Sequence, residues 1–447
     1  MRVLLLQAVS TIPGGECVYP LGLARLAAML KGKHELRGLD LNLAPYPWPA
    51  VIEAADGFQP QAVCISFRNL DPLAGNLISF VPPLKTLATL LRHCAPRARL
   101  IIGGAGFSLF ARRLLEEVPE LDLGLIGEAE QSLPLLLRRL DTPATVPGVV
   151  LRGMKGPAIG GRCRALDLSA LSPPDYVVFP PAAYQARNSY VASMGVEAKR
   201  GCPRRCSYCL YPSLQGGGQR LFPPGAVVDE LERLRHGYNV NMVHFTDPVL
   251  NQPAAHLRAI CREIIGRGLA IGWTGFFRED GLTSGDLDLY RRAGLAALYF
   301  SADGASEPAL KLLGKGLTLG QIERAAQLAA ASGVISVYHF LVNLPCETPN
   351  SAAQTKRLAE RILEDHAKAG NPAAMVFNNL RPYPGAPLTD SLLAAGLLDR
   401  RTDLLYPVYF NPPPFDGLRH QLNALCTKPE HLGLVGGESP GVVKCAP

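Results

Sequence analysis

The sequence contains no apolar stretch that approaches the roughly 20 residues needed to cross a bilayer. Its N-terminal apolar run, in MRVLLLQAVST, is too short for a secretory signal peptide, and no clear small-residue cleavage site follows it. These absences exclude a membrane-spanning or secreted protein. They predict a cytoplasmic protein with no membrane partner.

Blocks of like charge are also missing. The chain has 45 Lys and Arg against 38 Asp and Glu, for a formal net charge of +7, but the basic residues are scattered. A mild, dispersed positive charge usually solvates a surface, so we expect no nucleic-acid partner. The phosphates of a cofactor could still use it.

A fourth thiol is missing beside three that share a spacing. The segment KRGCPRRCSYCLYP places Cys202, Cys206 and Cys209 close together, and the other eight of the eleven cysteines are spread singly. In a reducing compartment cysteines stay thiols. Zinc normally takes four nitrogen or sulfur ligands, whereas three thiolates can hold three corners of a compact cluster. The spacing therefore predicts a metal cluster with one position left open.

Strands and helices alternate in residues 1–140. With 447 residues and 48% hydrophobic content, the chain can bury two substantial cores. The pattern predicts an α/β fold that begins with a doubly wound, mostly parallel sheet covered by helices on both faces. The expected strands are 2–9, 35–43, 61–67, 99–104 and 121–128. Ligands of such sheets bind at the carboxyl ends of the strands, which carry Ser66, Arg68, Asn69, Gly103, Gly104 and Glu128.

The alternation stops at residues 141–190, which are dense in Gly and Pro and predict a linker. It resumes over 191–395, where six βα repeats predict a partial (β/α)6 barrel with its functional groups at the carboxyl ends of the strands. The expected strands are 190–198, 242–247, 270–277, 297–303, 334–342 and 373–382. Residues 396–447 are a C-terminal extension that either covers the barrel as a lid or wraps its side.

Residues 1–140 resemble the cobalamin-binding-type domain that precedes many radical S-adenosylmethionine (SAM) enzymes. The resemblance rests on YPLGLARLAAML, SFRNLD, IIGGAGF and GLIGEAEQSLPLLL, while the Asp-x-His-x-x-Gly motif that can supply a histidine ligand to cobalt is missing. It implies a cofactor site at Arg68, Gly103 and Gly104, with Arg68 near the lower face of the corrin, where a guanidinium has no lone pair to offer. Two interpretations stay open: cobalamin bound without a strong lower ligand, or a domain that has lost the cofactor and pairs Arg68 with a carboxylate.

The cysteine spacing, with Tyr208 just before the last thiol and the first barrel strand just before the motif, resembles the radical SAM signature. The resemblance covers roughly residues 190–390. It implies a [4Fe-4S] cluster on Cys202, Cys206 and Cys209, whose unique iron is chelated by the amino and carboxylate groups of SAM. Tyr208 then lies in the cofactor site.

Two further segments support this resemblance. In HFTDP, Asp247 matches the acid that accepts from the methionine amino group of SAM. In YFSADGAS, Asp303 matches the first residue of the family's Glu-Ser-Gly-Ser stretch, and Gly304 replaces a serine, which removes one expected hydroxyl contact. Arg278 in FFRED either contacts the cofactor carboxylate or forms a salt bridge with one of the two acidic residues that follow it.

The resemblance implies that the reduced cluster cleaves SAM and that a 5′-deoxyadenosyl radical removes hydrogen from a small-molecule substrate. An electron donor such as flavodoxin or ferredoxin is then a required partner. With cobalamin bound, this architecture implies a methyltransferase.

A polar rim at the ends of the barrel strands suggests a different reaction, because fixed acceptors suit a desolvated aminosugar. Its members are His244, Asp247, Asn251, Glu279, Asp280, Asp303, His339, Asn343, Glu347, Asn378 and Asn379. With the missing histidine motif, this rim resembles the radical SAM diol dehydratases of apramycin-type aminoglycoside biosynthesis, which act on paromamine. That resemblance implies loss of water from a sugar radical, a proton donor among Tyr299, His339 and Glu347, and a partner reductase. Dehydration is the main prediction and methyl transfer the alternative.

Overall fold

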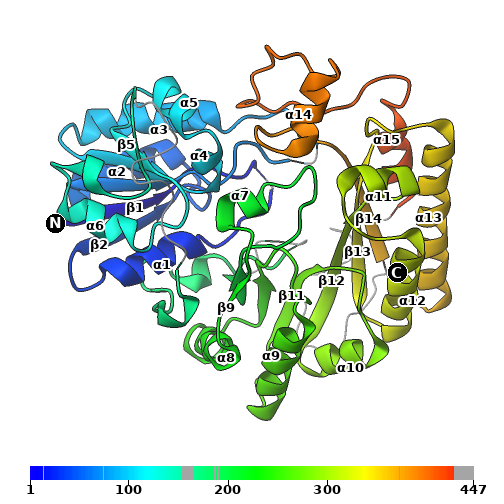
Figure 1. Ribbon diagram of the computed structural model, residues 1–447. Helices are drawn as coiled ribbons and strands as arrows, with labels where there is room; N and C mark the ends of the chain where they lie inside the picture. The colour runs from blue at the N-terminus through cyan, green and yellow to red at the C-terminus, as the bar shows by residue number, and fades with distance from the viewer. Residues whose placement is uncertain are drawn as a thin grey trace. The chain divides into compact units, whose positions relative to one another are not determined.

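A computed structural model describes residues 1–426 apart from 14, 74, 154–165, 186, 187, 189, 190 and 372. The backbone divides into two compact units. The first comprises residues 1–184 with 405–407, and the second comprises residues 185–404 with the chain from 408 onward. Figure 1 shows a sheet flanked by helices in each unit.

The first unit is built on a six-stranded sheet in the order β2-β1-β3-β4-β5-β6. Its strands are β1 (Arg2–Gln7), β2 (Glu35–Asp40), β3 (Ala62–Ser66), β4 (Arg99–Gly103), β5 (Leu123–Leu125) and β6 (Val149–Leu151). The first five are parallel, and β6 pairs with β5 in the antiparallel sense. The strand order reverses direction between β1 and β3, and ligands of open α/β sheets bind at such a switch point.

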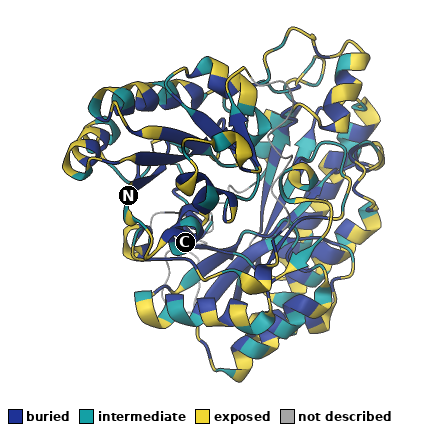
Figure 2. Cartoon of the chain, turned by 60° about the vertical axis from the view of Figure 1, so that its left-hand side comes forward, coloured by how far each residue is buried: buried dark blue, intermediate teal, exposed yellow. Residues whose placement is uncertain are grey.

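Helices cover both faces of this sheet, as in a doubly wound fold (Figure 1). Helix α1 contacts α6, and α2 contacts α3. Most of their apolar residues are buried and most of their charged residues are exposed, and Figure 2 shows helices that are dark blue on one side and yellow on the other. The helices are α1 (Leu21–Leu30), α2 (Pro47–Phe58), α3 (Val81–Cys94), α4 (Ala105–Leu109), α5 (Ala111–Glu117) and α6 (Ser132–Arg138).

Much of the segment expected to be a linker packs on the first unit. Residues 149–151 form the edge strand β6, and the Tyr184 hydroxyl donates to the Asp40 carboxylate at 2.8 Å. The Tyr19 hydroxyl likewise donates to the backbone carbonyl of Phe179 at 2.9 Å. The division between the units falls after Tyr184, inside the expected linker range. Residues 154–165 of that range lie outside the described part of the chain.

The second unit contains a six-stranded parallel sheet in the order β14-β13-β12-β11-β10-β7. Its strands are β7 (Gly195–Val196), β10 (Met242–Phe245), β11 (Gly272–Phe277), β12 (Leu295–Asp303), β13 (Ile335–Val342) and β14 (Ala373–Asn379). Each lies inside or within two residues of an expected strand. A small antiparallel pair, β8 (Lys199–Arg200) and β9 (Arg220–Leu221), was not predicted.

Helices connect the barrel strands, and several begin at a hydroxyl N-cap. Thr283, Ser306, Thr318 and Thr348 each accept a backbone N–H of the first turn, which satisfies a donor that the helix leaves unpaired. The helices are α7 (Tyr211–Gln215), α8 (Pro224–Glu232) with a π-helical turn at Arg233–Gly237, α9 (Ala254–Gly266), α10 (Ser284–Arg292), α11 (Glu307–Leu313), α12 (Leu319–Ser332), α13 (Pro349–Lys368) and α14 (Pro387–Ala394).

The C-terminal extension runs, in its described part, along the outer strand β14. Helix α15 (Leu418–Asn423) contacts this strand. The Asn423 amide accepts from the backbone N–H of Phe377 at 3.0 Å and donates to the carbonyl of the same residue at 2.9 Å. It thereby occupies backbone groups that the edge of the sheet leaves unpaired. Of the two expected positions, the described residues take the one along the side of the sheet.

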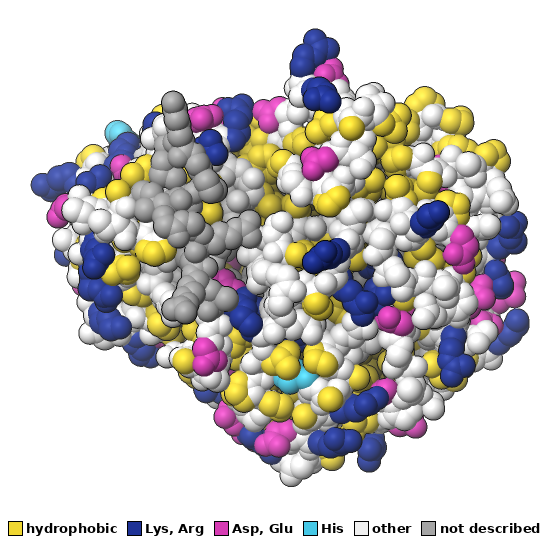
Figure 3. All heavy atoms as spheres, in the orientation of Figure 1, with side chains coloured by type: hydrophobic (Ala, Val, Ile, Leu, Met, Phe, Trp, Pro, Cys, Tyr) yellow, Lys and Arg dark blue, Asp and Glu magenta, His cyan; other side chains and the backbone are white. Residues whose placement is uncertain are grey.

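The predicted fold class is confirmed: a doubly wound sheet precedes a parallel barrel sheet and a C-terminal extension. Among the residues that the structure describes, no helix combines the length and apolar composition needed to cross a membrane. On the face drawn in Figure 3, Lys and Arg side chains are interspersed with Asp and Glu.

Candidate cluster and cofactor site

The three spaced cysteines lie on one loop of the second unit, between β8 and α7. Pairing of β8 with β9 closes the base of this loop. The Cys202 N–H donates to the carbonyl of Gly216 at 3.2 Å, and the Cys209 N–H donates to that of Cys206 at 3.1 Å. Gly201 has φ +84°, and a Cβ there would collide with the carbonyl of Gly218, so this position requires glycine. The backbone therefore folds the loop back on itself.

The thiols of this loop lie near one another and near two cations. Cys202 is buried, and Cys206 and Cys209 are partly buried. Burial, with a smaller effect from the other two thiols, raises the pKa of the Cys209 thiol to about 11. Burial also raises the pKa of Cys206, which the charges of Lys315 and Arg278 oppose. Metal binding would displace these protons, and the nearby cations would offset the negative charge of the thiolates.

The donor set fits an iron–sulfur cluster. In the described part of the chain, no group of three or more His, Cys, Asp or Glu side chains could hold a single metal ion. A [4Fe-4S] cluster is larger than one ion and takes a thiolate at each ligated corner. Cys202, Cys206 and Cys209 are therefore the residues that would hold it.

The cysteine loop is fastened to the barrel through Ser207, which lies between two of the thiols. Its backbone N–H donates to the carbonyl of Leu313 at 2.9 Å, and its hydroxyl donates to the carbonyl of Leu312 at 2.8 Å. The N–H of Leu388, in the first turn of α14, donates to the Ser207 carbonyl at 2.8 Å. These bonds join the loop to the end of α11 and the start of α14.

Asp303, a predicted SAM ligand, lies at the end of β12 with φ +57°. The Lys315 ammonium is 2.8 Å from its carboxylate, and the Tyr208 hydroxyl donates to the same carboxylate. Asp303 thus connects the cysteine loop to the loop after α11. Contact of Asp303 or Tyr208 with SAM stays a prediction.

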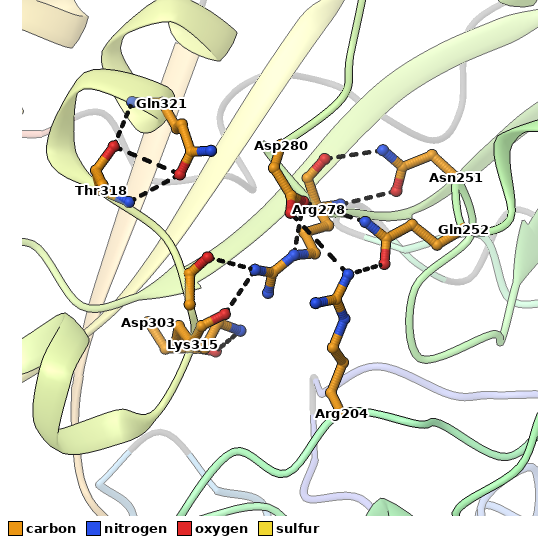
Figure 4. Close-up of polar contacts among 10 residues, drawn as sticks. Arg204, Asn251, Gln252, Arg278, Asp280, Asp303, Lys315, Thr318 and Gln321 are labelled. Atoms are coloured by element: carbon orange, nitrogen blue, oxygen red, sulfur yellow. Dashed lines mark hydrogen bonds and ion pairs between the residues drawn. The ribbon is translucent and has the colours of Figure 1, made fainter.

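Arg278 follows β11 and is buried, with a paired side chain (Figure 4). Its Nε lies 2.6 Å from a carboxylate oxygen of Asp280, and its terminal nitrogen donates to the carbonyls of Lys315 and Gly316. The Asn251 amide binds the backbone N–H and C=O of Arg278 at 2.9 and 2.8 Å. The structure thus contains the salt bridge that was one of the two expectations for this residue.

Asp247 follows β10 and is fully buried. Its carboxylate accepts the backbone N–H of Lys199 at 2.6 Å and that of Ala198 at 3.2 Å. Burial raises its pKa to about 7, although these N–H groups and the Lys199 charge oppose the shift. Asp247 therefore joins β10 to the residues after β7, and its expected bond to the SAM amino group stays a prediction.

The three proposed proton donors occupy different environments. Tyr299 is fully buried in the barrel core. Glu347 lies in the turn before α13, where its carboxylate accepts from Ser351 at 2.6 Å and from the N–H of Asn343 at 2.9 Å. His339 is partly exposed on β13, and its Nδ1 bonds the carbonyl of Phe300 at 2.8 Å. That bond requires a proton on Nδ1, so Nε2 of the neutral ring is an acceptor.

The expected cobalamin residues of the first unit lie at the carboxyl edge of its sheet. Arg68 is exposed just after β3, at the switch point, and its Nε donates to the Asn69 amide at 3.3 Å. Gly104 has φ +100°, and a Cβ there would approach the Phe67 carbonyl to 2.7 Å. Gly104 is thus required by the backbone of its own sheet, whereas Gly103 has ordinary space around it. Their contact with a cofactor stays a prediction.

Hydrogen bonds fix the loops at the carboxyl edge of the first unit's sheet, as expected of a preformed ligand site. The loops after β1, β2 and β3 are joined by amides: Asn42 accepts from Ser10 N–H at 2.8 Å, and Asn69 donates to the Ser10 carbonyl at 3.3 Å. Such cross-links fix the loops around the switch point, with the Arg68 side chain exposed beside them. The residues present therefore fit a large, polar cofactor at this edge.

Sequence reasoning missed Lys315, which the structure places beside Asp303. Its signal was the segment GKGLT at residues 314–318. Gly314 and Gly316 have φ of +63° and +62°, so the lysine is held between two left-handed glycines. A basic residue between two glycines, shortly after a strand that ends in Asp303, was the available clue.

Comparisons with known proteins match both units. Residues 9–137 match the B12 binding domain model, and residues 196–359 match the Radical SAM superfamily model. An uncharacterized methyltransferase of Pyrococcus horikoshii is 25% identical over 384 residues, which cover 85% of this chain and 79% of the relative. The cytidylyl-2-hydroxyethylphosphonate methyltransferase of Streptomyces wedmorensis is 24% identical over 464 residues, covering 91% and 84%.

A solved structure shares the fold over nearly the whole chain. It is the radical SAM methyltransferase TsrM from Kitasatospora setae with tryptophan and a SAM analogue bound. The TM-score is 0.78 at 20% identity, and the match covers 96% of this chain and 90% of that one. The order of a cobalamin-type unit followed by a radical SAM unit is therefore shared.

Proposed function

Since this chain belongs to the radical SAM superfamily and carries a B12-binding domain before its radical SAM domain, we propose that it is a cobalamin-dependent radical SAM methyltransferase acting on a small molecule. The observation that carries the proposal is the presence of both domains on one chain, each with a fitting set of residues. The named methyltransferases that it resembles over most of their length support the same reaction.

In this proposal each unit supplies one part of the chemistry. Bound cobalamin would carry the methyl group, while the [4Fe-4S] cluster would supply the electron that cleaves SAM. Cys202, Cys206 and Cys209 would hold the cluster, and the ties of Ser207 and Tyr208 keep their loop in place on the barrel. If cobalamin binds beside β3, Arg68 would offer it no lone-pair donor.

The electron count requires a partner. One SAM is reduced by one electron to methionine and a 5′-deoxyadenosyl radical, which takes a hydrogen atom from the substrate. The substrate radical would take the methyl group from methylated cobalamin. One more electron would then reduce the cobalamin, and a second SAM would methylate it again and leave as S-adenosylhomocysteine. We expect an electron-transfer protein of the flavodoxin or ferredoxin class to supply both electrons.

Dehydration of an aminosugar has less support than methyl transfer. The rim that suggested it is largely engaged in internal bonds: Asp280 pairs with Arg278, Asn251 binds the Arg278 backbone, and Asn343 donates to Asn411 at 2.7 Å. Groups already bonded within the chain offer less to a cationic sugar. The dehydratase reading, with its partner reductase, stays an untested prediction.

The test needs no knowledge of the substrate. The cluster is reconstituted anaerobically, and the protein is incubated with SAM and dithionite, with and without hydroxocobalamin. We expect S-adenosylhomocysteine only when cobalamin is present, because methylation of the reduced cofactor by SAM produces it. Formation of 5′-deoxyadenosine without any cobalamin-dependent S-adenosylhomocysteine would contradict methyl transfer and favour dehydration.

A further inference from the structure

The concave side of the barrel sheet carries a cluster of four rings from four strands. His244 on β10 lies 5.5 Å from Tyr299 on β12, and Phe276 on β11 lies 5.6 Å from His339 on β13, as ring centroid distances. Each contact skips one strand. Strands two apart in a flat sheet are separated by about 9.5 Å, so side chains in such contact point to the concave side.

This concave face is filled at one end and incompletely covered at the other. Toward the amino ends of the strands it is closed by a buried core of Ala297, Tyr299, Ile335, Val337 and Ala374. Toward the carboxyl ends, alternate residues stay partly exposed: Phe276, Ser301, His339, Leu341, Val376 and Asn378. These six residues form the concave upper face. On β13 and β14 they follow the spacing of two that places side chains on one face of a strand.

The concave upper face is uncharged: Phe276, Leu341 and Val376 are apolar, and Ser301, His339 and Asn378 are neutral polar residues. Burial lowers the pKa of His244 to about 4 and lowers that of His339, so both rings are neutral near pH 7. Asp303, the next partly exposed position on β12, is paired with Lys315 at 2.8 Å. Among the described residues of this face there is thus no carboxylate without a cationic partner.

An ammonium group placed against this surface would lose its water and gain no counter-charge. Removing a charge from water without providing a partner is unfavourable, so this surface favours substrates that carry no charge there. Rings at the distances found here can instead accept another ring in an edge-on or tilted contact. The ring planes of Phe276 and His339 meet at 51°, and the Tyr299 ring contacts both of these rings.

We infer that the part of the substrate placed against the concave upper face is an uncharged aromatic ring. This inference rests on the proposed function, because it assigns the substrate class of that reaction. Phe276 and His339 would contact the ring, Val376 would pack against it, and Asn378 would bind a polar edge of the substrate. The proposal replaces the cationic aminosugar that the rim had suggested.

The test measures the binding of two probes to the cluster-reconstituted full chain by saturation-transfer difference NMR. Indole represents the uncharged aromatic class, and paromamine the polycationic sugar. We expect saturable binding of indole below about 1 mM, the affinity range of a small fragment. Replacing Phe276→Ala should weaken it roughly five- to tenfold, the range of one lost ring contact. Paromamine should show no saturable binding.

Two further variants serve as controls for the effect of Phe276→Ala. Phe276→Leu keeps an apolar side chain and should weaken indole less than Phe276→Ala does, and Leu397→Ala, at an exposed site, should not change it. Retention of iron by each variant confirms that it is folded. Saturable binding of paromamine would overturn the inference. So would an affinity for indole that Phe276→Ala leaves unchanged. Failure of cobalamin-dependent S-adenosylhomocysteine formation would overturn the proposed methyl transfer instead, since probe binding requires no turnover.

Discussion

The Lys315 ammonium and the partly buried Asp303 carboxylate form an ion pair at 2.8 Å, and the Tyr208 hydroxyl donates to the same carboxylate. The pair joins three segments that are distant in the sequence: the cysteine loop, the end of β12 and the loop after α11. Because Tyr208 lies between two of the thiols, the position of the cluster loop depends on this ion pair.

Replacing Lys315→Met should lower the free energy of unfolding of the second unit by about 3 kcal/mol. Loss of the ammonium leaves the partly buried Asp303 carboxylate without its cation, and removing one partner of such a pair is destabilising. The measurement is urea unfolding followed by tryptophan fluorescence. The chain has two tryptophans, so a Trp48→Phe background leaves Trp273, which is fully buried in the second unit, as the reporter.

The matched control is Lys311→Met, at an exposed position of α11 in the same background. It should change the free energy of unfolding by less than about 0.5 kcal/mol. Equal effects of the two substitutions would show that the ion pair contributes nothing specific.

Glu279 makes stability depend on pH. Both carboxylate oxygens are buried without a hydrogen-bond partner among the described residues. Burial and the charge of Asp303 raise the pKa of Glu279 to about 7, despite the opposing charges of Lys315 and Arg278. The folded protein therefore holds this proton up to about pH 7, while the unfolded chain releases it near its ordinary pKa of about 4.3. The contribution of Glu279 to stability is full below that value, falls between about pH 4.3 and 7, and is constant above.

Replacing Glu279→Gln should remove this dependence. At pH 8 the variant should be more stable than the wild type by up to about 3 kcal/mol, since a raised pKa of this size corresponds to that free energy. At pH 4 the two should differ little. The comparison is the same urea unfolding at both pH values, with Glu360→Gln on the exposed side of α13 as control. If the wild type and the Glu279→Gln variant differed in free energy of unfolding by the same amount at both pH values, the prediction would be refuted.

The strands could be predicted because their signal is local. Apolar runs such as 99–104 and 334–342 are long enough to identify buried strands, and the structure has strands there. Strand β6 and the pair β8–β9 were not assigned, because a two- or three-residue strand has no periodicity. Their existence depends on partners brought back by chain reversal.

The polar residues of the site could be located but not their partners. Asp303, Arg278 and Asp247 were expected at the ends of strands, and each lies there. A sequence does not show that backbone N–H groups of Ala198 and Lys199 occupy the Asp247 carboxylate, because that contact spans about fifty residues. The sequence therefore predicted that the rim residues could bind a sugar, whereas in the structure many of them are bonded to other residues of the chain.

The cluster assignment predicts a specific loss of iron. Cys206→Ala should reduce bound iron from about four atoms per chain to near zero after anaerobic reconstitution, since a ligated corner loses its thiolate. Cys94→Ala, which changes a cysteine at the end of α3 in the first unit, should keep the wild-type iron content. Iron and acid-labile sulfide analyses provide the measurement. Full iron content in the Cys206 variant would contradict the assignment of this thiol.

The exposed guanidinium of Arg68 predicts the coordination of cobalt. If cobalamin occupies the edge beside β3, the protein offers no nitrogen from this residue to its lower face. The electron paramagnetic resonance spectrum of bound cob(II)alamin should then show no nitrogen hyperfine splitting. Arg68→His places an imidazole there and should introduce that splitting, while Arg68→Gln, whose amide is a poor ligand, should not. Nitrogen splitting already present in the wild type would show that another group ligates cobalt and that Arg68 does not define its lower face.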